Sequence, residues 1–155
     1  MYFLDESVLP QAMAMGQVIL RTMNERGITK RSPIGCLIIG VEQEHELLVL
    51  ANISYDESLW GAIDYAVVAK GKGVVCARER MDTLAIAKLE PWRFQRGDCR
   101  YPGAVYRDGL VVAFSGIEAR NDHTISAMIA ELVMGLSYMA HEEAQQALQG
   151  IAFLE

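Results

Sequence analysis

The chain has 155 residues and a net charge of −6, with 52% hydrophobic and 22% charged residues. A chain of this length buries enough surface to fold as one domain without a structural metal or disulfide bond. The composition excludes a disordered or low-complexity protein. Cys36, Cys76 and Cys99 show no CxxC spacing, so we predict reduced thiols rather than a zinc site.

The beginning of the chain has no basic segment followed by a long apolar run, and we expect no signal peptide. Apolar runs such as 110–114 are far shorter than the roughly 18 residues that a membrane span needs. These features predict a cytoplasmic protein with no membrane partner. The acidic net charge and the absence of a binding motif also predict no nucleic-acid partner.

The first predicted element is a helix over residues 5–26, with Ser7 as a candidate N-cap and Gly27 as its end. Apolar residues repeat along it at helical spacing, which predicts one buried face: Val8, Ala12, Met15, Ile19 and Met23. Two apolar runs follow, 33–41 and 46–54, and the polar turn between them indicates a hairpin.

A second helix is predicted from near Leu59, and the glycines of Lys70-Gly71-Lys72-Gly73 are expected to weaken it. A short helical piece over 81–89 follows, with Asp82 as its cap and Pro91 as its stop.

The Asp108-Gly109 pair between two β-rich runs, 104–107 and 110–114, is the sharpest local signal, because both residues tolerate the positive φ of a type I′ turn. Asn121 or Asp122 is the candidate cap of a long last helix. The order of elements predicts an α+β fold, an antiparallel sheet of hairpins flanked by helices. We expect one domain over 1–140 and a C-terminal helical extension with an apolar tail over 141–155.

The stretch from Pro102 to Gly116, with its Asp108-Gly109 turn, followed by Asp122 and Ile125, resembles the GlcG/HbpS-like family. That family includes the C-terminal domain of PduO-type proteins. Upstream residues extend the resemblance to about 5–137: Ser32-Pro33, Leu47 to Leu50, Ala62-Ile63-Asp64, Ala66 and Lys70. The stretch after the second predicted strand and the one after Gly116 depart from the family pattern, as in a divergent member.

This resemblance implies a profilin-like or GAF-like sandwich, frequent homo-oligomerisation and, in some members, binding of haem or a related tetrapyrrole. Residues 70–107 hold nine Lys or Arg against four Asp or Glu, a net +5 against −11 elsewhere. Such a basic region can hold an anionic ligand, or it can be a solvated face or pair with an acidic patch of another copy.

We expect the ligand to lie between the basic region and the second predicted hairpin. The candidate ligand-binding residues are Lys70, Lys72, Arg96, Arg100, Gly103, Ser115 and Gly116. No metal ligand is predicted, although His123, near the positive end of the last helix, is a candidate haem ligand or else a surface residue. Cys99 lies near two arginines and is either reactive or an incidental thiol.

Aromatic residues are candidates for a flat pocket wall, or equally for core or subunit contacts: Trp60, Trp92, Tyr101 and Tyr106. No acid, base and nucleophile set stands out. The leading hypothesis is therefore a non-enzymatic module that binds a small anionic ligand or a cofactor. The alternatives are an enzyme acting on a small anionic metabolite and a structural, self-associating subunit. We predict a homo-oligomer, because the charge split and the apolar tail 151–154 both favour contact between copies.

Overall fold

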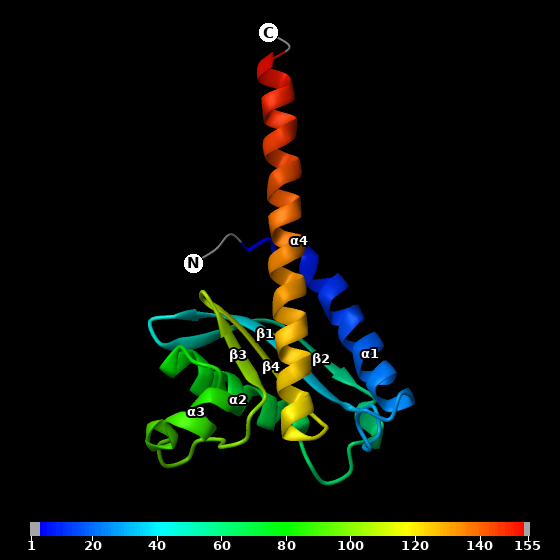
Figure 1. The fold of residues 1–155 in the computed structure, drawn as a ribbon, viewed down its shortest axis with the longest axis vertical. Helices are drawn as coiled ribbons and strands as arrows, with labels where there is room; N and C mark the ends of the chain where they lie inside the picture. Colours follow the sequence, from blue (N-terminus) through cyan, green and yellow to red (C-terminus); the bar gives the residue numbers. More distant parts are fainter. Residues whose placement is uncertain (1–3, 154–155) are drawn as a thin grey trace.

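The computed structural model describes residues 4–153, in which helices and strands follow the predicted order (Figure 1). The helices are α1 Leu9–Glu25, α2 Tyr65–Glu79, α3 Thr83–Leu89 and α4 Ala119–Phe153, and the strands are β1 Gly35–Gln43, β2 Glu46–Tyr55, β3 Ala104–Arg107 and β4 Leu110–Ser115. Single turns of 3-10 helix cover Glu6–Val8, Glu57–Leu59 and Pro91–Arg93.

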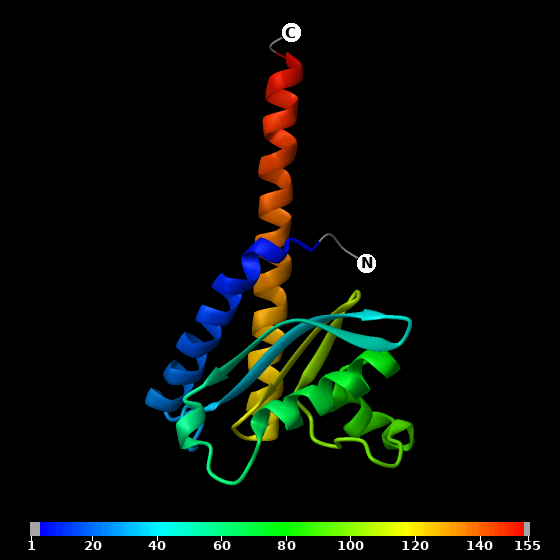
Figure 2. The ribbon, with the colours of Figure 1, turned by 180° about the vertical axis from the view of Figure 1, so that it is seen from behind.

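The four strands form one antiparallel sheet in the order β2-β1-β4-β3. Figures 1 and 2 show α1 and α4 on one face and α2 with α3 on the other. Each face has its own apolar core: Leu37, Phe114 and Ile129 belong to the first, and Cys36, Ala77 and Ala113 to the second. Because β1 and β4 are covered on both faces, their side chains are buried nearly throughout. The α+β prediction is confirmed.

The Asp108-Gly109 turn joins β3 and β4 as predicted, with φ of 48° at Asp108 and 97° at Gly109. The outer edge of β3 is closed by side chains from the start of α3. Thr83 Oγ1 accepts hydrogen bonds from the amides of Gly103 and Ala104, both at 3.0 Å, and Asp82 Oδ1 accepts one from the Tyr106 amide at 2.8 Å. The segment before β3 is therefore held against the sheet.

Two helices differ from their predicted positions. Helix α2 begins at Tyr65 rather than near Leu59, because the Asp64 carboxylate caps it by accepting from the amides of Ala66 and Val67. In α1 the buried face is turned slightly from the predicted one: Met13 and Leu20 are buried, whereas Met15 is 42% exposed.

The glycines of α2 are packing positions rather than weak points. A Cβ on Gly73 would lie 3.0 Å from Leu47 Cδ2 and 3.6 Å from Ala113 Cβ. The missing side chain lets α2 lie close to the sheet. The neighbouring Lys72 therefore reaches the end of β4, where it contacts Phe114.

Helix α4 has 35 residues and extends well beyond the rest of the molecule (Figure 1). Its first half packs on the sheet and on α1. It runs through the predicted 140/141 boundary without a break, so a separate extension from 141 stays a prediction. The apolar tail 151–154 lies where no side chain is described.

Candidate functional site

A cavity of about 320 Å³ opens where β4 ends and α4 begins. Its lining comes from the end of β4 and the link to α4, from the first turn of α4, from α2, and from three loops that carry Arg31, Ile63 and Tyr101. The lining residues are Arg31, Ile63, Tyr65, Val68, Lys72, Tyr101, Ser115, Gly116, Ile117, Ala119 and Asp122. Figure 2 shows that the start of α2 and the base of α4 meet at this end of the molecule.

A buried ion pair forms the floor of the cavity. Lys72 Nζ lies 2.9 Å from Asp122 Oδ2, and it also donates a hydrogen bond to the carbonyl oxygen of Phe114 at 3.0 Å. The side chains of Lys72 and Asp122 are only 2% and 4% exposed. The second carboxylate oxygen of Asp122 accepts from the Ile117 amide at 3.0 Å. These bonds join α2, β4 and α4 at one point.

Asp122 is not the N-cap of α4, although it was one of the two predicted caps. The helix begins at Ala119, and the Asp122 amide donates to the Glu118 carbonyl at 2.8 Å. The Asp122 side chain instead bonds the Ile117 amide, which precedes the helix and has no helical partner. Asp122 thereby orients the link between β4 and α4 that faces the cavity.

Two glycines allow close packing at the cavity, Gly103 against the ion pair and Gly116 against the start of β1. A Cβ on Gly103, whose φ is +143°, would lie 2.7 Å from Lys72 Nζ and 2.7 Å from the Phe114 carbonyl oxygen. A Cβ on Gly116, whose φ is +159°, would collide with the backbone of Ile34 and Gly35. Gly103 and Gly116 are both predicted ligand-binding residues. Gly116 lines the cavity, whereas Gly103 does not line it and instead leaves room for the Lys72 side chain.

The charges at the cavity leave one cation without a counter-ion. Arg31 makes no ion pair with any described residue, and its guanidinium lies 3.5 Å from the Ile117 carbonyl oxygen. The loop that carries Arg31 is tied to α4 by Glu118, which accepts from the Thr29 hydroxyl at 2.5 Å and the Lys30 amide at 3.2 Å. The hydrogen bond from Thr29 is the main reason that the pKa of Glu118 falls to about 2.

Burial raises the pKa of Asp122 to about 6, against the opposing effects of Lys72, the Ile117 amide and Arg31. At pH 7 and above the three charged groups of the cavity are therefore Arg31, Lys72 and an ionised Asp122. Their sum is one positive charge, and the N-terminus of the 35-residue α4 adds a positive dipole end at Ala119. The cavity is suited to a single negative charge.

The structure brings together some of the predicted ligand-binding residues and separates others. Lys72 and Ser115 line the cavity with Gly116. Lys70 projects elsewhere from α2, beside a shallow surface depression next to Cys99. Arg96 and Arg100 are exposed and do not line the cavity. The basic region is thus divided between a buried lysine and a separate surface.

The candidate aromatic residues lie in different surroundings. Tyr101 lines the cavity. Trp60 stands behind the cavity wall, packed edge-on against Tyr65 with ring centroids 5.4 Å apart. Tyr106 lies within 3.4 Å of Glu42, and Trp92 is exposed on the surface.

Among the polar and aromatic residues of the lining, sequence reasoning missed three. Arg31 lies in a loop with no local sequence motif that indicates a binding site. Tyr65 is the first residue of a helix that was expected to begin earlier. Asp122 was considered only as a cap. The sequence offered one signal for Asp122, which lies in the stretch that resembles the family. The helix starts soon after a strand that ends in glycine, so a carboxylate in its first turn lies near the end of that strand.

Comparison with solved structures shows the fold. The chain is similar to the Klebsiella pneumoniae protein ORFY, described as DUF336, with a TM-score of 0.57 and 11% identity over 84% of this chain and 90% of that one. It is also similar to the Ybr137w protein, with a TM-score of 0.52 and 15% identity over 77% and 76%. The PduOC:heme complex aligns with a TM-score of 0.49 and 13% identity over 77% and 89%.

No family model and no curated protein sequence matches the chain. DUF336 is GlcG-like, so the fold that the family resemblance implied is confirmed. The shared fold spans 84% of the chain in the comparison with ORFY.

The cavity lining offers haem few of its usual partners. It holds no histidine, cysteine or methionine, which leaves Tyr65 and Tyr101 as candidate iron ligands, and Arg31 is its one cation without a carboxylate partner among the described residues, whereas haem carries two propionates. His123 lies on α4 outside the lining, and burial is the main cause that lowers its pKa. Its Nδ1 is buried without a hydrogen-bond partner in the described structure. Among residues 4–153, no group of three or more His, Cys, Asp or Glu could hold a metal ion.

Proposed function

We propose that this protein is a divergent member of the GlcG/HbpS-like family that binds a small organic monoanion in the cavity at the start of α4. The observation that carries the proposal is the single uncompensated charge of Arg31 above a floor whose own charges are already paired. Lys72 and Asp122 are paired with each other and position the surrounding backbone. The planar guanidinium of Arg31 is the group that would bind a ligand carboxylate.

The walls indicate the body of the ligand. Tyr65 and Tyr101 with Ile63 and Val68 form an apolar, partly aromatic wall opposite the polar floor. Pockets of this kind fix an anion by a few polar groups and bury a flat or aliphatic body against apolar side chains. We therefore expect a carboxylate with an aromatic or short aliphatic body, and use benzoate and benzenesulfonate as probes.

Replacing Arg31 by glutamine should weaken benzoate binding about tenfold or more, because a bidentate charge-assisted contact is lost. The measurement is isothermal titration calorimetry with both probes. Arg26→Gln is the matched control, because Arg26 is exposed at the end of α1 and does not line the cavity. Equal affinities for the two variants, or no heat with either probe on the unmodified protein, would overturn the proposal. An absorbance spectrum of the purified protein with a Soret band would favour haem instead.

Anion binding should tighten as the pH falls through 6. Protonation of Asp122, whose pKa is raised to about 6 mainly by burial, removes the negative charge that offsets Lys72 and leaves two cations at the cavity. Benzenesulfonate keeps its charge throughout, so its affinity should rise roughly five- to tenfold between pH 8 and pH 5.

Two other groups are controls for this profile. Glu118, with a pKa of about 2, stays ionised throughout, and the His123→Gln variant should keep the profile because His123 lies outside the cavity lining. Affinity that is constant with pH, or that falls in acid, would contradict the role of Asp122.

A second candidate function, a self-associating structural subunit, is favoured by the end of α4, where every side chain from Glu142 to Leu148 is exposed. We propose a homo-oligomer, and a cytoplasmic location in which Cys36, Cys76 and Cys99 remain free thiols. No helix within residues 4–153 has the length and apolar character to span a membrane.

A further inference from the structure

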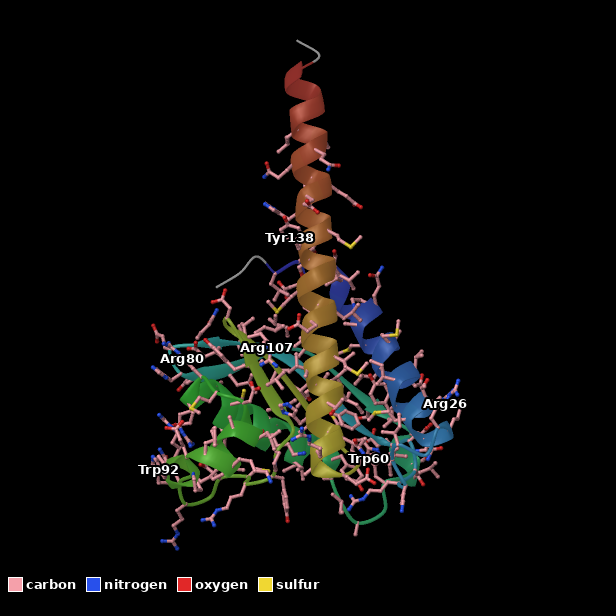
Figure 3. The ribbon with its side chains drawn as sticks, viewed as in Figure 1. Arg26, Trp60, Arg80, Trp92, Arg107 and Tyr138 are labelled. Carbon is pink, nitrogen blue, oxygen red and sulfur yellow. The ribbon has the colours of Figure 1, made fainter. Side chains whose placement is uncertain are left out.

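Two surfaces with large exposed apolar side chains lie at opposite ends of the molecule. The first is the α4 arm, residues 138–153, in which Tyr138, Met139 and Leu148 are 62%, 56% and 62% exposed. The second is the 88–96 patch, formed by Lys88, Leu89, Trp92 and Arg96, in which Leu89 and Trp92 are 71% and 73% exposed. Figure 3 shows Trp92 near the base of the molecule, while the arm extends from the other end.

The α4 arm is long enough to need a partner. Near the start of the arm, the Ser137 hydroxyl oxygen accepts a hydrogen bond from the Asp5 amide at 3.1 Å, and farther along every side chain from Glu142 to Leu148 is exposed. A helical segment of this length gains little stability in water by itself, and most helices are held by the packing of an apolar face. Large exposed apolar side chains on a free helix mark an interaction surface.

The arm and the patch carry opposite charges. No lysine or arginine occurs from Asn121 to the end of the chain, and Glu142 and Glu143 have no ion pair in the described part of the chain. The patch has the reverse character. Its acidic neighbour Glu90 is paired with Arg93 at 3.2 Å, whereas Lys88 and Arg96 have no ion pair in the described structure.

Ion pairs within the chain neutralise the acidic residues near the patch, so the patch keeps a positive charge. Arg93 also lies 3.1 Å from Glu79, and Arg78 holds Asp98 at 2.8 Å. The carboxylates of the loop are thus neutralised within the chain and fix the loop in place, while two cations remain outside beside Leu89 and Trp92. Tryptophan and arginine are the side chains most enriched at the energetic centre of protein interfaces.

We propose that the α4 arm of one copy docks on the 88–96 patch of a second copy. Each surface meets the opposite charge in this contact, whereas two arms would bring acidic helices together and two patches would bring cations together. A chain cannot make the contact with itself, because α4 is one continuous helix directed away from the patch. The contact joins two different surfaces, so it builds a head-to-tail assembly or a reciprocal dimer.

Charge exchange tests the contact. The arm variant Glu142→Lys/Glu143→Lys and the patch variant Lys88→Glu/Arg96→Glu should each lower self-association at least tenfold, measured by sedimentation velocity over a concentration series at low salt. An equal mixture of the two variants should associate again, and so should one chain that carries all four changes. The matched control is Arg21→Glu/Arg26→Glu on the exposed side of α1, which should leave association unchanged.

The rival contacts give different results. Pairing between two arms would leave the patch variant by itself fully associated, whereas the proposed contact requires its association to fall. A second readout is the fluorescence of Trp92 in a Trp60→Phe background, which should shift to shorter wavelength as the unmodified protein associates. A monomeric mass for the unmodified protein at every concentration, or association that neither charge change affects, would overturn the proposal.

Discussion

Replacing Asp122 by asparagine is expected to lower the free energy of unfolding by about 1–3 kcal/mol, because an amide has one acceptor oxygen where the carboxylate has two, so either Lys72 Nζ or the Ile117 amide loses its buried acceptor. The substitution also removes the one carboxylate among the described residues that lies within 4.0 Å of Lys72 Nζ, and the Lys72 side chain is only 2% exposed. The cost of a buried, uncompensated charge exceeds what the ion pair itself contributes. Urea unfolding followed by circular dichroism measures the change.

Two variants show whether the effect comes from the buried charge. The double substitution Lys72→Met/Asp122→Asn removes both charges and should recover most of the lost stability. Glu42→Gln breaks the pair with Arg80, which is 2.9 Å long but involves a half-exposed guanidinium, and should cost about 1 kcal/mol or less. If Asp122→Asn is no more harmful than Glu42→Gln, the pair does not hold α2, β4 and α4 together.

The fold could be predicted where the signal is local. The Asp108-Gly109 turn depends on two residues that tolerate positive φ, and the hairpin forms around them as expected. The first hairpin was predicted for the same kind of reason, from two apolar runs around a polar turn. By contrast, the start of α2 was misplaced, because Leu59 and Ile63 continue a helical apolar spacing that the Asp64 cap overrides.

The candidate site was only partly predictable because it joins segments far apart in the chain. Lys70 and Lys72 look alike in the sequence Lys-Gly-Lys-Gly, and only the rotation of α2 on the sheet decides that Lys72 is buried. Its partner Asp122 lies 50 residues away. Arg31 reaches the cavity through the bond between Thr29 and Glu118, which are 89 residues apart. No local pattern indicates such contacts.

The net charge of +5 over residues 70–107 includes residues with different roles. Arg78, Arg80, Arg93 and Arg107 are held in ion pairs within the chain. Lys72 belongs to the floor of the cavity, and Lys88 with Arg96 remains at the surface. The net charge of a segment therefore indicates an anionic partner only after its internal ion pairs are known. Here the exposed cations Lys88 and Arg96 lie outside the cavity lining.

Replacing Gly116 by alanine should lower the free energy of unfolding by about 2–5 kcal/mol, through steric strain at both its φ and its neighbours. Its φ of +159° lies at the limit of the region that disfavours a side chain, and an added Cβ would meet the Ile34 carbonyl and would lie 2.6 Å from the Gly35 Cα. These contacts are with backbone, so β1 would have to move away from the end of β4. The cavity beside Gly116 should widen, and benzoate affinity should fall with stability.

Gly135→Ala is the matched control for this substitution. Gly135 is exposed in the middle of α4, and an added Cβ there would meet nothing within 4 Å. Alanine at such a helix position should raise stability by about 0.5–1 kcal/mol, because it restricts the unfolded chain. The same chemical change thus has opposite signs at two positions of one chain. A Gly116→Ala variant as stable as Gly135→Ala would mean that β1 and the β4 end are not packed backbone against backbone beside the cavity.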